Sequence, residues 1–200
     1  MESARKDLVT SEQFMNSVLS RNGQIGRAAC EIMAAAVNSV DPYQIVRQQV
    51  KKNQNRLMIQ DEIVHLDSIE QVFIIGFGKA SVPMAQALID VLDGEVVLAE
   101  VVTKDHKFLK DSGYQGILNV HIGGHPIPTQ ASFEATRGLM QNLKHLSPND
   151  LVLVCISGGG SALFCDPFPE ISLNDWKEMT DVLIKSGADI QEINTIRKHL

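Results

Sequence analysis

The sequence is poor in cysteine and has no excess of positive charge. Three cysteines occur among the 200 residues, and no two of them have the spacing of a metal-binding pair. This usage favours a reducing compartment. The formal net charge is −6, and no basic face is evident in the pattern. The charge therefore argues against a general nucleic-acid binder.

A long apolar run and a targeting pattern are also missing. No apolar stretch reaches the length of about 20 residues that a membrane-spanning helix needs. The N-terminus carries the acidic residues Glu2, Asp7 and Glu12. A secretory signal would need an apolar run there, and a transit peptide would avoid acidic residues. The sequence therefore predicts a protein with no membrane partner, and it favours a cytoplasmic over a mitochondrial location.

What the sequence does contain is an alternation of short apolar strands and amphipathic helices. Strands are expected at residues 72–75, 96–102, 117–122 and 151–156. Helices are expected at residues 25–40, 43–52, 80–92, 129–146, 172–186 and 189–200, with a small hairpin at 56–66 and a polar loop at 105–114. Strands that alternate with helices in this way indicate an α/β fold of right-handed βαβ units. Its sheet is mostly parallel and is covered by helices on both faces.

The stretch at residues 151–163 is the centre of this pattern. Residues 151–156 are apolar without interruption, which is typical of a strand buried inside a parallel sheet. The strand ends in a loop rich in glycine, Ser157-Gly158-Gly159-Gly160-Ser161. Glycines let the backbone turn tightly and let a ligand approach the peptide N–H groups, so this loop can cradle phosphate or carboxylate oxygens. A tight turn without a ligand explains the same pattern.

Three other strands also end in polar motifs. They are Gly76-Phe77-Gly78-Lys79, Thr103-Lys104 and Gly123-Gly124-His125-Pro126-Ile127-Pro128. Ligands of open α/β sheets bind at the carboxyl ends of the strands, so these motifs and the glycine-rich loop are expected to form one site. Independent structural turns would not need two lysines, a histidine and two serines at one edge.

Lys79 is the candidate for the main charged residue of that site. Its motif does not match the dinucleotide fingerprint, which needs a third glycine at Ser81, or the Walker loop, which needs serine or threonine at Ala80. The lysine instead adds a positive charge to the N–H groups at a helix N-terminus, where a cation is unfavourable unless an anion is bound. The alternative is a solvated surface lysine.

His125 and three residues near the C-terminus have more than one interpretation. The prolines around His125 stiffen its loop, and the imidazole could act as a general base, donate to a substrate or brace the loop. Arg197 and Lys198 place two cations on a predicted helix surface near Asn194. The residues alone favour a solvated helix face with charge at a helix end for these three.

Taken together, the motifs resemble the class II glycerate kinases, also called glycerate 2-kinases, which have a MOFRL-type C-terminal domain. The order and spacing of the motifs agree over residues 25–200, and the matching stretches are Gly76-Phe77-Gly78-Lys79-Ala80, Val101-Val102-Thr103-Lys104, Gly124-His125-Pro126-Ile127-Pro128, the glycine-rich loop, Ser186-Gly187-Ala188-Asp189-Ile190 and residues 192–200. The resemblance implies a Rossmann-like, three-layer α/β/α sandwich for residues 25–200 and a variable N-terminal extension for residues 1–24. It also implies that the family's second, C-terminal domain is absent, and it leaves open whether the chain is a fragment or a natural short isoform.

The resemblance further implies the reaction. Members of the family transfer phosphate from ATP, with Mg²⁺, to D-glycerate, and produce 2-phosphoglycerate and ADP. The lysine of their Gly-Lys-Ala motif corresponds to Lys79, which is expected to stabilise the transferring phosphoryl group or the glycerate carboxylate. Substrate or nucleotide binding is then expected of Gly76, Gly78, Lys104, His125, Ser157, Gly158, Gly159, Gly160, Ser161, Asn194, Arg197 and Lys198. The metal ligands stay unassigned, and the fragment alone is expected to be inactive.

Two other classes of function stay open. Members of the family have been described as hydroxypyruvate reductases, although the incomplete glycine fingerprint argues against NAD(P)H binding. A non-catalytic, truncated form that binds a partner is the third class. The sequence leaves the oligomeric state, the nucleotide preference and the phosphorylated oxygen open.

Overall fold

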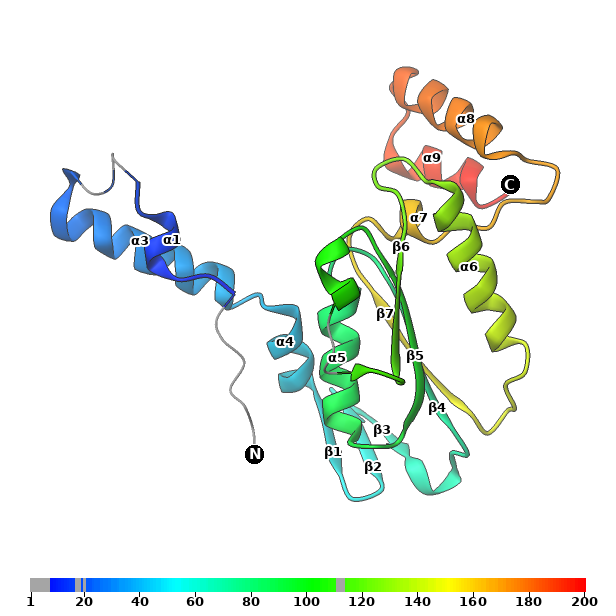
Figure 1. Cartoon of the computed structure of the whole chain (residues 1–200), viewed down its shortest axis with the longest axis horizontal. Helices are drawn as coiled ribbons and strands as arrows, with labels where there is room; N and C mark the ends of the chain where they lie inside the picture. The colour runs from blue at the N-terminus through cyan, green and yellow to red at the C-terminus, as the bar shows by residue number, and fades with distance from the viewer. Residues whose placement is uncertain (1–7, 17–18, 20, 111–113) are drawn as a thin grey trace.

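A parallel sheet organises the fold. The computed structural model describes residues 8–16, 19, 21–110 and 114–200. Four strands form the sheet in the order β6 (Leu118–Ile122), β5 (Val96–Thr103), β4 (Val72–Phe77) and β7 (Leu151–Ile156). All neighbouring pairs are parallel, and Phe77 is in register with Val102 on one side and Ile156 on the other. The strands therefore end level, which puts the loops that follow them at one edge of the sheet (Figure 1).

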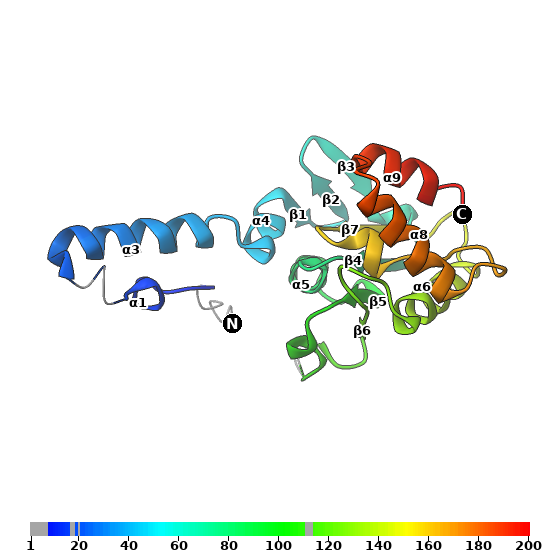
Figure 2. The ribbon, with the colours of Figure 1, turned by 90° about the horizontal axis from the view of Figure 1, so that it is seen from above.

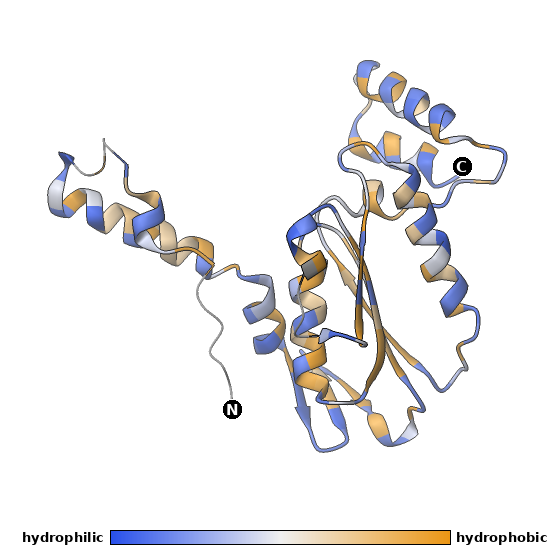
Figure 3. Cartoon of the chain, in the orientation of Figure 1, coloured by the Kyte–Doolittle hydropathy of each residue, from blue (hydrophilic) through white to orange (hydrophobic). Residues whose placement is uncertain are grey.

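Helices cover both faces of this sheet, as the three-layer expectation requires. α5 (Ser81–Leu92) packs against the face that carries Ile74, Val101 and Cys155. α6 (Gln130–Leu143) covers the opposite face, where Leu139 packs on Val102. Hydrophobic residues gather in the strands and in α5 (Figure 3). The predicted fold class is therefore confirmed, with α6 ending before the expected residue 146.

β7 lies at the edge of the described sheet rather than inside it. The prediction of a strand at residues 151–156 is confirmed, but its expected burial on both faces is wrong. Leu153 and Cys155 belong to the core beneath α5, whereas Val154 is 49% and Ile156 is 62% exposed. Their face is open because α6 packs mainly over β5 and β6. A continuous apolar run thus predicts a strand without predicting how many neighbours cover it.

The segment between the N-terminal helices and β4 forms a second, antiparallel sheet. α4 (Pro42–Gln49) ends before the expected residue 52, because β1 (Val50–Asn53) follows it directly. β1 pairs with β2 (Arg56–Ile59), and β2 pairs with β3 (Glu62–His65), which confirms the expected hairpin and adds a strand to it. Val50 is buried opposite Ile59, and this pairing competes successfully with one further helical turn.

The N-terminal helices form an arm that extends away from the sheet (Figures 1 and 2). The arm consists of α1 (Ser11–Phe14) and α3 (Gly23–Asn38). The apolar face that the sequence predicts for α3 is largely open, with Ile25 80% and Ile32 70% exposed. The predicted boundary between residues 24 and 25 falls inside this helix. Residues 1–7 of the predicted N-terminal extension lie outside the described residues.

The C-terminal helices begin at the expected caps. α8 (Leu173–Lys185) follows Ser172, whose Oγ accepts a hydrogen bond from the Asp175 N–H at 3.1 Å. α9 (Ile190–Arg197) follows Asp189, whose carboxylate accepts from the N–H of Glu192, and it ends before the expected Leu200. The connecting segments also contain the short helices η1 (Leu66–Ser68), η2 (His106–Lys110) and α7 (Gly160–Leu163). η2 occupies part of the expected polar loop, whose residues 111–113 are not described.

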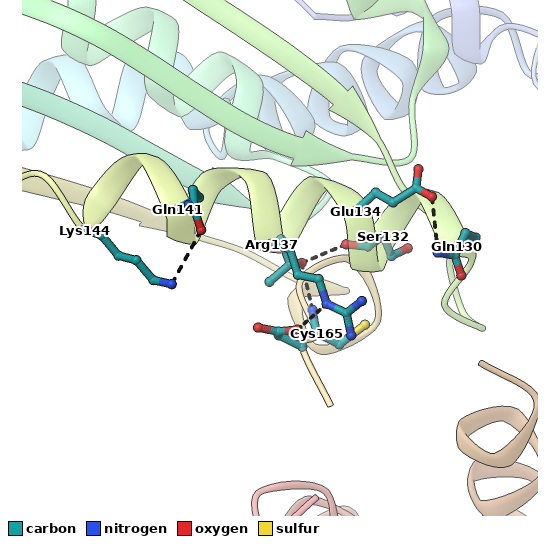
Figure 4. A network of polar contacts seen from close by, with 9 residues as sticks. Gln130, Ser132, Glu134, Arg137, Gln141, Lys144 and Cys165 are labelled. Atoms are coloured by element: carbon teal, nitrogen blue, oxygen red, sulfur yellow. Dashed lines mark hydrogen bonds and ion pairs between the residues drawn. The ribbon is translucent and has the colours of Figure 1, made fainter. Parts of the chain in front are cut away.

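A buried hydrogen bond attaches the segment after α7 to α6. The hydroxyl of Thr136 donates to the Ser132 carbonyl at 2.8 Å and accepts from the Cys165 N–H at 3.1 Å. Thr136 is only 1% exposed, so these bonds are shielded from water. Arg137, on the next position of the helix, instead forms a half-exposed ion pair of 2.8 Å with Asp166 (Figure 4).

Replacing Thr136 by valine should therefore destabilise the chain. The substitution keeps the shape of the side chain but leaves the buried Cys165 N–H without an acceptor. We expect the free energy of unfolding to fall by about 1–3 kcal/mol. Arg137→Gln is the matched control, because an exposed ion pair contributes less than about 1 kcal/mol. Urea unfolding, followed by the fluorescence of the single tryptophan, measures both variants. Equal losses would contradict this assignment.

Candidate functional site

Two loops at the carboxyl edge of the sheet are hydrogen-bonded to each other. One joins β4 to α5, and the other, here called the glycine loop, comprises residues 157–161 and runs into α7. The Lys79 N–H donates to the Gly158 carbonyl at 3.0 Å, and the Ala80 N–H donates to Ser157 Oγ at 2.9 Å. A side chain at Gly78 would not fit, because its Cβ would lie 2.2 Å from Ser157 Oγ. The two loops therefore form one rigid unit.

This link changes the expected use of the helix N-terminus. The N–H groups of Lys79 and Ala80 already have acceptors within the chain, so they are not free to bind an anion. Ser157 likewise uses its side-chain oxygen to accept one of these bonds. Its role in the structure is to join the two loops. The expected anion site at the start of α5 is therefore occupied by the protein itself.

Free backbone donors lie in the glycine loop instead. Among the residues that the structure describes, the N–H groups of Gly158 and Gly159 have no protein acceptor. Gly159 has a φ of +88°, a conformation that favours glycine. A Cβ at Gly159 would lie 2.7 Å from Cδ2 of His125 and 3.4 Å from Cε of Lys79, so both side chains lie against this residue. Two unpaired N–H groups, an ammonium and an imidazole thus meet at one place.

Lys79, Lys104 and His125, here called the basic cluster, determine the electrostatics of this place. Burial, followed by the positive charges of Lys79 and Lys104, lowers the pKa of His125. The imidazole is therefore neutral near pH 7 and has one donor and one acceptor nitrogen. Lys79 and Lys104 are exposed, as expected for residues that meet a ligand. An excess of positive charge next to free N–H groups suits an anion such as phosphate.

The other predicted glycines serve close packing. A Cβ at Gly76 would lie 2.8 Å from the Val101 side chain, and a Cβ at Gly160 would lie 2.9 Å from the Phe77 ring. The Phe77 ring itself stacks on Phe164 with a centroid distance of 4.4 Å. The lack of a side chain at Gly76 and Gly160 therefore allows Val101 and Phe77 to pack closely against the backbone, and the structure does not present either glycine to a ligand.

The remaining predicted residues lie around a different cavity. A pocket of about 330 Å³ is lined by ten residues, among them Ser161, Asn194, Arg197 and Lys198. Arg197 does not point freely into this space, because its guanidinium donates to the Ser161 carbonyl at 2.5 Å. The structure thus divides the predicted site into two groups. The basic cluster and Gly158–Gly159 form one, and the residues of α9 and its C-cap form the other.

The basic cluster does not fit a Mg²⁺ site. Mg²⁺ prefers oxygen ligands in octahedral geometry, whereas this cluster offers two ammonium groups and an imidazole. Within the described ranges, no three histidine, cysteine or acidic side chains are grouped so that they could hold a metal ion. The residues do fit phosphate oxygens, which accept hydrogen bonds from ammonium and backbone N–H groups.

Two residues near the site were not predicted from the sequence. Ser132 Oγ accepts from the Gly124 N–H at 2.9 Å and the Thr129 N–H at 3.2 Å, which attaches the loop of His125 to α6. Its position three residues after the Thr129 cap is a signal that could have identified it. The ring of Trp176 lies 5.3 Å from the Arg197 guanidinium, and no local sequence pattern indicates that contact.

Comparison with known proteins identifies the family. Residues 28–200 match DUF4147, which is described as a domain of unknown function. The chain belongs to this family. Its curated relatives include the glycerate 2-kinase of Pyrococcus horikoshii, which is 38% identical over 169 residues, or 84% of this chain and 37% of that protein. A putative hydroxypyruvate reductase of Agrobacterium vitis is 37% identical over 127 residues, or 64% of this chain and 28% of that protein. The crystal structure of Thermotoga maritima glycerate kinase gives a TM-score of 0.68 at 32% identity, over 85% of this chain and 37% of that one.

These matches confirm the resemblance to glycerate kinases and the α/β fold that it implies. They also show that the chain spans little more than a third of the length of the relatives it matches. In the described part of the chain, no helix is long and apolar enough to cross a membrane. The cytoplasmic location stays a prediction.

Replacing Lys79 by methionine should raise the pKa of His125. The substitution removes one of the two cations that oppose protonation of the imidazole and keeps an unbranched side chain in place. Lys144→Met is the control, because Lys144 lies at the far end of α6, and it should leave the pKa of His125 unchanged. An NMR titration of the imidazole Cε1 protons measures both. An unchanged pKa of His125 in Lys79→Met would show that the basic cluster does not exist in solution.

Proposed function

We propose that the chain binds the phosphate groups of ATP and serves as the phosphate-binding part of a glycerate kinase. The observation that carries the proposal is the pair of unpaired N–H groups at Gly158 and Gly159, together with the side chains of Lys79 and His125, which lie against Gly159. Successive N–H groups in a turn of this kind form a concave site for anions. The names of the relatives, one of which is a D-glycerate 2-kinase, supply the reaction class and the acceptor.

The basic cluster suits phosphoryl transfer, which depends on positioning and positive charge more than on covalent catalysis. Lys79 stabilises the charge that develops on the transferring phosphoryl group, and Lys104 contributes to binding at longer range. His125, neutral near pH 7, is suited to accept a hydrogen bond from the hydroxyl group of D-glycerate. Mg²⁺ would neutralise part of the phosphate charge when bound with ATP, and none of the described residues is assigned to it.

A reductase is the second candidate, because two of the relatives carry the name of a putative hydroxypyruvate reductase. The dinucleotide fingerprint would need its third glycine at Ser81, where a buried hydroxyl donates to the Gly78 carbonyl at 2.9 Å. Two assays on a protein of the relatives' length separate the candidates. ADP release with D-glycerate and ATP supports the kinase, whereas oxidation of NADH with hydroxypyruvate supports the reductase. We expect the chain alone to bind ATP with little or no turnover. A non-catalytic chain that binds a partner would neither bind ATP nor turn over either substrate.

Replacing Lys79 by alanine tests the proposed site directly. We expect the dissociation constant for ATP to rise about 10- to 150-fold, since a hydrogen bond to a charged group contributes about 1.5–3 kcal/mol. Because Lys79 is exposed, the free energy of unfolding should stay within about 0.5 kcal/mol of the wild-type value. In a protein of the relatives' length, the same substitution should lower turnover about 100- to 1,000-fold.

Lys107→Ala is the matched control for that experiment. Lys107 is also an exposed lysine of the carboxyl edge, but it pairs with Asp105 at 2.9 Å. Isothermal titration calorimetry with ATP should therefore give the wild-type dissociation constant for this variant. If Lys79→Ala binds ATP as tightly as Lys107→Ala, the proposed function is wrong.

A further inference from the structure

Arg197 is bound to the glycine loop and not free for a ligand. Its Nη2 donates to the Ser161 carbonyl at 2.5 Å, and its Nη1 lies 3.4 Å from Ser161 Oγ. Hydrogen bonds from a charged donor are shorter and stronger than neutral ones. Two arms of the planar guanidinium are thus used on a single residue of α7.

The flat face of the same guanidinium lies against Trp176. The distance from its central carbon to the ring centroid is 5.3 Å, within the range of a cation–π contact. Trp176 is 4% exposed and packs with Phe133 and Cys165 in an apolar cluster. The ring is therefore a fixed surface, and it restricts Arg197 to the orientation in which the guanidinium reaches Ser161.

Ser161 lies inside the short hydrogen-bonded turn that presents the free N–H groups. The Gly160 N–H donates to the Ser157 carbonyl at 3.2 Å, and the Ala162 N–H donates to the Gly159 carbonyl at 3.2 Å. The Leu163 N–H also donates to Gly159, at 3.3 Å. Because Gly159 is held from both sides of Ser161, a movement of α7 would change the direction of the N–H groups at Gly158 and Gly159.

We infer that Arg197 is a positioning residue, which holds Ser161 and thereby keeps the N–H groups of Gly158 and Gly159 directed toward one anion. This inference deepens the proposed function and rests on it for the identity of the anion. The structural part, that Arg197 holds α7, does not depend on any ligand. Lys185 provides a control, since it is an exposed cation of α8 that pairs with Asp181 at 2.5 Å and does not line the pocket around Arg197.

Amide hydrogen exchange of the ligand-free chain tests whether Arg197 holds the loop. In Arg197→Ala, the amides of Ala162, Leu163 and Phe164 should exchange about tenfold faster, because local opening of α7 becomes easier. The amides of β4 should keep their wild-type rates, and so should all of these amides in Lys185→Ala. If the β4 amides of Arg197→Ala also accelerate, the fold as a whole is destabilised. In that case Arg197→Lys takes the place of Arg197→Ala in the experiment. Lysine keeps the positive charge but has neither the forked donors nor the flat stacking surface of arginine, so the amides of residues 162–164 should exchange at rates between those of the wild type and Arg197→Ala.

Titration with inorganic tripolyphosphate tests whether this positioning matters for binding. Arg197→Ala should raise the dissociation constant about tenfold, whereas Lys185→Ala should stay within about twofold of the wild type. The fluorescence of Trp176, the single tryptophan, should change when tripolyphosphate binds to the wild-type chain and should not change in Arg197→Ala.

The outcomes separate the inference from the proposed function. Unchanged exchange at residues 162–164 in Arg197→Ala would overturn the inference. Faster exchange with unchanged tripolyphosphate affinity would also overturn it, since Arg197 would then be only a structural contact. A wild-type chain that does not bind tripolyphosphate contradicts the proposed function, and the exchange rates still decide whether Arg197 holds the loop.

Discussion

The hydrogen bonds between the loop after β4 and the glycine loop are the constraint on which the candidate site depends. They form because β4 and β7 are parallel neighbours in register, so that Phe77 and Ile156 end side by side. The bond from the Lys79 N–H to the Gly158 carbonyl then directs that carbonyl into the protein. As a consequence, the N–H groups of Gly158 and Gly159 stay available for an anion. Ser157 and Gly78 are needed at this contact for their geometry, one as an acceptor and the other for its lack of a side chain.

The electrostatics of the site follow from the sheet topology. The chain as a whole is acidic, with a net charge of −6. Because four parallel strands end at one edge, Lys79, Lys104 and His125 come together from three different loops. Positive charge is thereby concentrated at one place on an acidic protein, which favours binding of a small anion over binding of a large polyanion. Burial is the larger cause of the lowered pKa of His125, and this concentration of positive charge lowers it further.

Much of the fold was predictable because its signals are local. Apolar runs predicted the four strands, and the caps at Ser172 and Asp189 predicted where α8 and α9 begin. Burial of β7 was not predictable, because an apolar run does not indicate how many elements cover it. The start of β1 at Val50 was missed for a related reason, since pairing with β2, and not local propensity, ends α4.

The site was predicted in part for the same physical reason. The convergence of Lys79, Lys104 and His125 follows from the rule that parallel strands end at one edge. Which groups are already used by the protein does not follow from any such rule. The acceptors for the Lys79 and Ala80 N–H groups come from a loop more than 70 residues later in the chain. The partner of Arg197, Ser161, lies 36 residues earlier, in α7. Because of these long-range bonds, the N–H groups at the start of α5 and the guanidinium of Arg197, which were predicted to bind a ligand, hold the protein together instead.

The most direct test of the central claim is to follow the backbone amides of Gly158 and Gly159 by ¹⁵N–¹H NMR while tripolyphosphate is added. If these N–H groups bind the anion, their resonances should shift downfield and saturate together with the shift of the His125 imidazole. The amides of Lys79 and Ala80, which have acceptors within the chain, should move much less. Large shifts at Lys79 and Ala80 with none at Gly158 and Gly159 would contradict the account, because the anion would then bind at the start of α5.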